Sequence, residues 1–180
     1  NTLNAIAEWC RRDPLAAESA LLDLSSMLRT LLTSLKAETW TLGQELALVE
    51  KLWRLHDWRH SEPTLATIEA DARMHGLPFP PLLLLGIAEN AVKHAAPNTR
   101  ACDYVLRVNS NGGRMDIEVH NPGVLNSVAT DAQPEGLGVP TLQHRLQEMY
   151  GNRASFALNQ QGSVVVARLQ LPLVASAERG

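Results

Sequence analysis

An apolar stretch, residues 82–87, is followed within two helical turns by four polar side chains: Glu89, Asn90, Lys93 and His94. Asn90 and Lys93 are three positions apart, so on a helix they share one surface. An asparagine oxygen can ligate a hard cation such as Mg²⁺, and a lysine ammonium binds phosphate as a point charge. The pair therefore indicates magnesium–nucleotide chemistry. The alternative is an ordinary helix end whose basic residues complement the helix dipole.

Two further motifs have the composition of ligand-binding turns. Asn121 and Gly123 flank a proline at the end of an expected strand, where a short polar side chain beside a glycine could contact the edge of a planar base. Such a tripeptide also forms ordinary β-turns. Gly136, Leu137 and Gly138 precede an expected helix, whose N-terminal N–H groups could bind phosphate oxygens. The alternative for this motif is a flexible loop.

Composition and charge limit the class of protein. The chain has 180 residues, of which 45% are hydrophobic and 19% are charged, as in globular domains with a substantial core. A net charge of -3 argues against nucleic acid as a direct partner. Neither a transmembrane segment nor a signal peptide is evident. Cys10 and Cys102 lack the spacing of a metal or redox pair, which favours two reduced thiols. Because the sequence starts without Met, we expect it to be part of a longer protein.

The first 36 residues predict a helical hairpin. Residues 1–12 carry one apolar stripe, and Asp13 followed by proline is typical of a new helix start. Residues 14–36 then form a long helix with a wide apolar face, which must pack against another helix of this chain or of a second copy. The leucines of this face are Leu21, Leu24, Leu28, Leu31, Leu32 and Leu35.

The remaining chain predicts mixed helices and strands. Thr41, followed by Gln44 or Glu45, resembles a capping box that opens a helix reaching about residue 60. Alternating apolar residues predict a strand and two hairpins, with a turn-rich loop over residues 121–138. The expected strands cover residues 65–70, 101–109, 115–120, 155–158 and 163–171, and a further helix covers residues 141–150. The fold class is therefore α+β.

Taken in order, these motifs resemble the ATP-binding domain of sensor histidine kinases in the GHKL ATPase superfamily. More narrowly, they resemble the autolysin-regulator branch, whose kinases usually signal to LytTR-type response regulators. The matching segments cover nearly the whole chain: residues 1–6, 42–45, 80–84, 89–94, 121–123 and 136–138. The resemblance implies an N-terminal helical hairpin belonging to a partial dimerisation domain (residues 1–38), an α/β sandwich of the GHKL ATP-binding type (residues 39–175) and a tail (residues 176–180).

The resemblance also implies cofactors and residue roles. ATP and Mg are the expected cofactors, with Asn90 as the Mg ligand and Glu89 and Asn90 as catalytic residues. The residues expected to contact ATP are Asn90, Lys93, His94, Asn121, Gly123, Gly136, Leu137 and Gly138. The superfamily usually has an aspartate and a second glycine where this chain has Asn121 and Leu125. This departure implies weaker ATP binding.

The implied activity is ATP-dependent phosphorylation of a histidine. In the family this histidine stands just before the segment matched by residues 1–6, so no phosphoacceptor is expected within this sequence. The expected partners are a second copy of the chain and a LytTR-type response regulator. This portion would be cytoplasmic, and its parent protein anchored in the membrane through upstream segments. The alternatives are a degenerate GHKL module that dimerises or binds a partner with little turnover, and a serine kinase that acts as an anti-sigma factor. The helical hairpin argues against the serine kinase.

Overall fold

A five-stranded sheet and five α-helices make up the computed structural model, which describes residues 2–37, 39–57, 65–95, 104–125 and 139–173. The helices are α1 (Thr2–Arg12), α2 (Pro14–Lys36), α3 (Leu42–Asp57), α4 (Leu83–Lys93) and α5 (Val139–Tyr150). The strands are β1 (Ala66–Ala70), β2 (Tyr104–Asn111), β3 (Arg114–Pro122), β4 (Ser155–Gln161) and β5 (Val164–Pro172). Two short 3₁₀ helices, η1 (Ala72–Met74) and η2 (Gly151–Arg153), complete the described elements.

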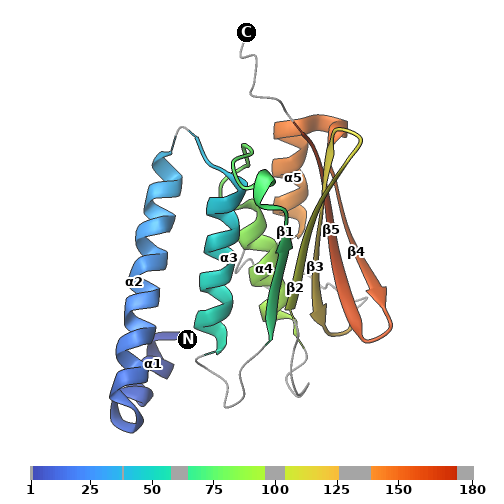
Figure 1. Ribbon diagram of the computed structural model, residues 1–180. Helices are drawn as coiled ribbons and strands as arrows, with labels where there is room; N and C mark the ends of the chain where they lie inside the picture. The colour runs from blue at the N-terminus through green and yellow to red at the C-terminus, as the bar shows by residue number, and fades with distance from the viewer. Residues whose placement is uncertain (1, 38, 58–64, 96–103, 126–138, 174–180) are drawn as a thin grey trace.

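The sheet has the strand order β1-β2-β3-β5-β4, with β1 parallel to β2 and the other pairs antiparallel. One face of the sheet is covered by α3, α4 and α5, and α1 and α2 form an outer helical layer against α3 (Figure 1). This arrangement confirms the predicted α+β fold, with a helical hairpin followed by a layered α/β unit. None of the described helices is both long and apolar enough to cross a bilayer.

Both predicted helix starts are confirmed by their hydrogen bonds. The Asp13 carboxylate accepts from the backbone N–H of Ala16 at 3.0 Å, which caps α2. At the start of α3, the Thr41 N–H donates to the Gln44 side chain at 2.9 Å, and the Gln44 N–H donates to the Thr41 hydroxyl at 3.3 Å. This reciprocal pair is a capping box that uses Gln44. Glu45 therefore has another role.

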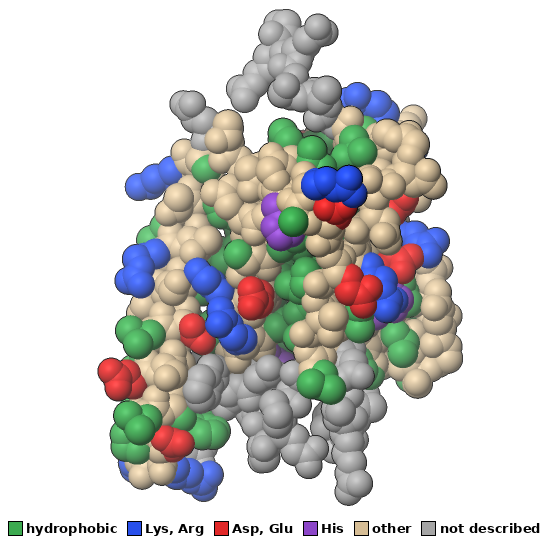
Figure 2. Space-filling view, in the orientation of Figure 1, with side chains coloured by type: hydrophobic (Ala, Val, Ile, Leu, Met, Phe, Trp, Pro, Cys, Tyr) green, Lys and Arg blue, Asp and Glu red, His purple; other side chains and the backbone are tan. Residues whose placement is uncertain are grey.

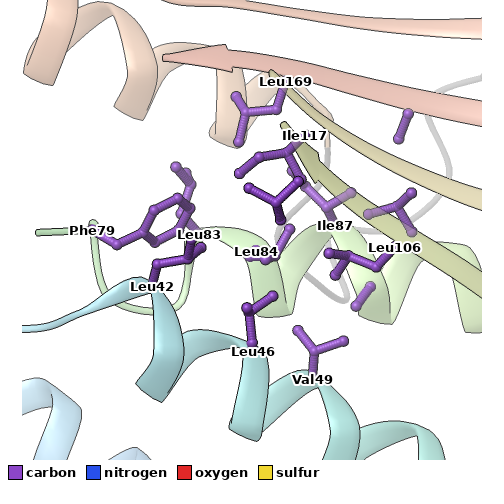
Figure 3. Close-up of a cluster of buried hydrophobic side chains, with 14 of the residues drawn as sticks. Leu42, Leu46, Val49, Phe79, Leu83, Leu84, Ile87, Leu106, Ile117 and Leu169 are labelled. Carbon is purple, nitrogen blue, oxygen red and sulfur yellow. The ribbon is translucent and has the colours of Figure 1, made fainter. Parts of the chain in front are cut away.

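The main core lies between the sheet and the three helices that cover it. Alternate residues of β3, of β5 and of β2 as far as Val108 face this core, as the period of two in a strand requires. In Figure 3 the side chains from α3, α4 and the strands point toward one another across this space. The labelled members are Leu42, Leu46, Val49, Phe79, Leu83, Leu84, Ile87, Leu106, Ile117 and Leu169. The core therefore holds α4 between α3 and the sheet.

The opposite face of the sheet is polar and carries a row of alternating charges. Glu69, Arg107, Glu118 and Arg168 lie directly across from one another on four neighbouring strands. Arg107 Nε donates to Glu69 at 2.8 Å, and Arg168 Nε donates to Glu118 at 2.9 Å. The hydrogen bond from Arg107 lowers the pKa of Glu69. Acidic and basic side chains are likewise interspersed over the face seen in Figure 2. Opposite charges in register favour this strand pairing.

The outer helix α2 uses only part of its predicted apolar face within this chain. Leu24 and Leu31 pack with Met27 against α3 and the start of α4. Leu21, Leu28, Leu32 and Leu35 remain exposed, and hydrophobic side chains are visible along the α2 edge of Figure 2. The prediction that α2 packs on another helix is confirmed by its contact with α3.

The predicted loop start at residue 121 is wrong, because β3 continues through Pro122. Asn121 pairs with Val165 and Pro122 pairs with Val164 at the end of the sheet. The structure accommodates the proline because it is the last residue of the strand, where the ladder needs no further donor from it. β4 likewise extends beyond the predicted residue 158, to Gln161.

Candidate functional site

The helix α4 presents the four polar residues that the sequence singled out. Its buried part comprises Leu83–Ala88 together with Ala91, since these residues face α3, α2 and the sheet. Asn90 is partly buried, whereas Glu89, Lys93 and His94 are exposed. His94 ends the helix, and its N–H donates to the Asn90 carbonyl at 3.0 Å. The last turn of α4 therefore changes from core packing to a polar surface within a few residues.

The side chain of Asn121 lies on the helix-covered face of the sheet. It follows the inward alternation of Ile117 and Val119 in β3 and is only 4% exposed. Its Nδ2 donates to the Pro122 carbonyl at 3.2 Å. A buried asparagine at this position is unusual, because buried polar groups need partners and every neighbour in the same alternation is apolar. The last inward-facing position of β3 is thus polar.

Gly123 brings the end of β3 against the end of α4. A Cβ at this position would lie 3.1 Å from the His94 carbonyl oxygen and 3.4 Å from Asn121 Nδ2. A side chain would therefore fill the space between the strand and the helix. The Gly123 N–H donates to the Ser163 carbonyl at 2.9 Å, which joins the same point to the β4–β5 hairpin. Figure 1 shows the ends of α4 and β3 and this hairpin at one edge of the molecule.

Gln160, which the sequence did not single out, supports this edge. Its Nε2 donates to the Gly123 carbonyl at 3.0 Å, and its Oε1 accepts from the Leu125 N–H at 2.6 Å. One side chain of β4 thus holds the backbone on both sides of residue 124. No pattern in the sequence indicates this role, because it depends on a contact between segments 35 to 37 residues apart.

The structure brings together six of the predicted site residues at one edge and leaves three undescribed. Those at the edge are Glu89, Asn90, Lys93, His94, Asn121 and Gly123. Gly136, Leu137 and Gly138 lie outside the described residues. The helix α5 begins at Val139, immediately after them.

A second missed residue is Glu45, whose carboxylate is fully buried. It accepts hydrogen bonds from the Trp40 indole at 2.7 Å and from the N–H groups of Leu82, Leu84 and Leu85 at 3.0 Å each. Burial raises the pKa of Glu45, and these four donors oppose the rise. The sequence signal that could have revealed this buried carboxylate is the position of an acidic residue within the apolar stripe of α3.

The comparisons with known proteins agree with this arrangement. The histidine kinase family pattern matches residues 1–64. The sensor protein LytS of Staphylococcus haemolyticus is 27% identical over 168 residues, which are 86% of this chain and 28% of the relative. LytS of Bacillus subtilis is 24% identical over 174 residues, 89% of this chain and 29% of the relative. The chain is thus similar in sequence to LytS sensor histidine kinases over most of its length. It spans less than a third of the length of these relatives.

Solved histidine kinase structures share the fold of this chain. The histidine kinase domain of a blue-light-activated kinase from Erythrobacter litoralis matches with a TM-score of 0.59 at 17% identity, covering 86% of this chain and 75% of that one. The catalytic domain of the histidine kinase ThkA matches with a TM-score of 0.56 at 12% identity, covering 76% of this chain and 97% of that one. The predicted family resemblance and the GHKL-type fold are therefore confirmed.

Proposed function

We propose that this chain binds ATP with Mg²⁺ at the edge where α4, β3 and the β4–β5 hairpin meet. We further propose that it is the catalytic portion of a two-component sensor histidine kinase. The observation that carries the proposal is the approach of Gly123 to the His94 carbonyl, where a Cβ would lie at 3.1 Å. It unites two motifs, 89–94 and 121–123, that are separate in the sequence and share one predicted ligand.

The residues present at this edge fit an adenine nucleotide. Asn121 uses Nδ2 to donate to the Pro122 carbonyl, so its Oδ1 is the atom that would accept from the adenine amino group. Because Gly123 has no side chain, the end of β3 approaches the His94 carbonyl oxygen and Asn121 more closely than another residue would allow. The carboxamide of Asn90 would ligate Mg²⁺, and the Lys93 ammonium would neutralise phosphate charge. Gly136, Leu137 and Gly138 would contact the phosphates just before the N-terminus of α5.

Bound Mg-ATP would supply the phosphoryl group for transfer to a histidine of the kinase. Such a transfer needs positioning and charge neutralisation more than covalent help from the protein. Asn90 and Lys93 would provide these, and the exposed Glu89 beside Asn90 would orient or polarise the reacting groups. The backbone carbonyl of His94 would border the site opposite Gly123.

The proposed partners follow from the exposed apolar face of α2 and from the family resemblance. A second copy would pack on α2, where Leu21, Leu28 and Leu35 recur every seven residues and are exposed. A response regulator, of the LytTR type by the family resemblance, would receive the phosphoryl group. The proposal has no direct role for nucleic acid. It places this portion in the cytoplasm, with membrane attachment through other parts of the protein.

A regulatory module with little turnover is the second candidate. The buried Asn121 favours it, because a neutral acceptor binds an amino group about half as strongly as a carboxylate does.

Substitution of Asn90 tests the primary proposal. We expect Asn90→Ala to abolish the Mg-dependent part of ATP-analogue binding, measured by calorimetry, while the thermal unfolding midpoint changes little because Asn90 is only partly buried. The matched control is Asn109→Ala, an exposed asparagine toward the other end of the β2–β3 hairpin, which should bind like the wild type. Full Mg-dependent affinity in Asn90→Ala would refute the assignment.

A further inference from the structure

The N-terminus of α4 is capped by a side chain from another helix. Helix starts leave N–H groups without intrahelical partners, and these are usually satisfied by a nearby Ser, Thr, Asp or Asn. At α4 the N-cap position is Leu82, which has no capping side chain. Glu45 of α3 takes this role: its Oε2 accepts from the Leu82 N–H, and its Oε1 accepts from the N–H groups of Leu84 and Leu85, at 3.0 Å each.

This arrangement is costly for the fold. Glu45 is 0% exposed, and a buried carboxylate must recover its lost hydration from hydrogen bonds. Leu82 also adopts φ 61°, a left-handed conformation that is unfavourable for a leucine. The conformation points the Leu82 N–H at the carboxylate, and the positive end of the helix dipole adds to the attraction. A local aspartate cap would satisfy the same groups without burying a charge from a distant helix.

The distant cap ties the start of α4 to α3. An α-helix rises 1.5 Å per residue, so Asn90 lies only about 9 Å along the axis from Leu84. A shift or rotation of the first turn therefore carries Asn90 and Lys93 with it. Leu82 and Leu85 also pack with residues of α2 and α3 in one cluster, so apolar contacts hold the same turn as well.

We infer that Glu45 is a positioning residue: its carboxylate sets the placement of α4 and hence of the Asn90 and Lys93 side chains toward the nucleotide. The inference rests on the proposed function for its ligand. It needs no contact between Glu45 and ATP, since the carboxylate is enclosed by Trp40 and the first turn of α4.

The test compares two neighbouring substitutions in the 180-residue chain. Glu45→Gln keeps the size of the side chain but replaces one accepting oxygen with an NH₂ group that faces N–H donors. Gln44→Ala is the matched control: it removes the side-chain half of the α3 capping box, a hydrogen bond with Thr41 in the same turn, and leaves the Glu45 bonds to α4 in place. Both are measured at a temperature where all variants are folded. The readouts are affinity for a non-hydrolysable ATP analogue with and without Mg²⁺, and backbone amide exchange in α4 and α5.

We expect Glu45→Gln to weaken the Mg-dependent affinity by roughly tenfold or more, because small misplacements of binding groups are expensive. Amide exchange should rise along α4, including the His94 N–H, relative to α5. Gln44→Ala should leave the Mg-dependent affinity at the wild-type value. Wild-type affinity in Glu45→Gln, or exchange that rises equally in α4 and α5, would overturn the inference.

This inference and the proposed function can fail separately. If the wild type shows no Mg-dependent binding, the proposed function fails, and the role of Glu45 is then tested by amide exchange in Glu45→Gln alone. Faster exchange confined to α4 supports the control of that helix by Glu45, and a uniform rise refutes it.

If Glu45→Gln does not fold, Glu45→Asp takes its place, because it keeps the charge but shortens the side chain by one methylene. The Asp variant should then show the same selective loss, and wild-type behaviour in it would refute the inference.

Discussion

Replacing Asn121 with aspartate should change stability and nucleotide affinity in opposite directions. Asn121 is 4% exposed, and its Nδ2 donates to the Pro122 carbonyl at 3.2 Å. An aspartate has no donor, so its carboxylate would face that carbonyl oxygen without a hydrogen bond. Leaving a buried polar group unsatisfied costs about 1–3 kcal/mol. For a domain of this size, a loss of about 2 kcal/mol lowers the unfolding midpoint by roughly 4–8 °C.

The same carboxylate should tighten ATP binding, because a charged acceptor forms a stronger bond with the adenine amino group than an amide does. We expect a gain of about 1 kcal/mol, or roughly fivefold in affinity. A guanine nucleotide should gain nothing, since it presents an acceptor oxygen where adenine has its amino group. Thermal unfolding without ligand and calorimetry with ATP and GTP analogues measure these three quantities.

Asn111→Asp is the matched control for Asn121→Asp. It adds the same charge at the exposed turn of the β2–β3 hairpin, opposite Arg114 and at the other end of β3 from Asn121. It should change neither stability nor affinity appreciably. If Asn121→Asp leaves ATP affinity unchanged or weakens it, or strengthens ATP and GTP binding equally, the side chain does not face the adenine.

Three more outcomes test other parts of the account. Gly123→Val should destabilise the chain by about 1–3 kcal/mol in denaturant unfolding and weaken analogue binding, because its Cβ would lie 3.1 Å from the His94 carbonyl oxygen. Wild-type binding in this variant would show that the close approach of Gly123 to His94 is not part of the site. Leu28→Glu should reduce self-association in sedimentation, and a monomeric wild type would remove the basis for the proposed α2 interface. Hydrogen bonds from the side chain and then the backbone N–H of Arg73 lower the pKa of Asp71 to about 2. The ionised Asp71 therefore stabilises the fold above its unfolded pKa, and this stabilisation is lost as the pH falls toward 2. An NMR titration of Asp71 should show a midpoint near 2, and a higher midpoint in Arg73→Gln. An unaltered midpoint in that variant would contradict the pairing of Asp71 with Arg73.

Much of this fold could be predicted because its signals are local. Asp13 before Pro14 and the Thr41–Gln44 pair mark helix starts through contacts three residues apart. The alternation in β2 and β3 reports which residues face the core. These features depend on neighbours in the sequence, and the structure confirms them.

The errors and omissions arise where distant segments meet. β3 continues through Pro122 because β5 pairs with it there, which the strong turn composition of residues 121–123 obscured. Glu45 looked like part of a capping box, although three of its four donors are backbone N–H groups of α4 and its N-cap, 37 to 40 residues away. The contact of Gly123 with His94 also depends on tertiary packing. The sequence could therefore indicate candidate site residues by type, but not the tertiary contacts around them.

The most direct test of the central claim is a calorimetric titration of this chain with a non-hydrolysable ATP analogue, with and without Mg²⁺. We predict binding with a roughly micromolar dissociation constant that requires Mg²⁺. This Mg-dependent binding should disappear in Asn90→Ala. Absence of binding at millimolar analogue, with the chain folded, would contradict the claim that the edge formed by α4 and β3 is a nucleotide site.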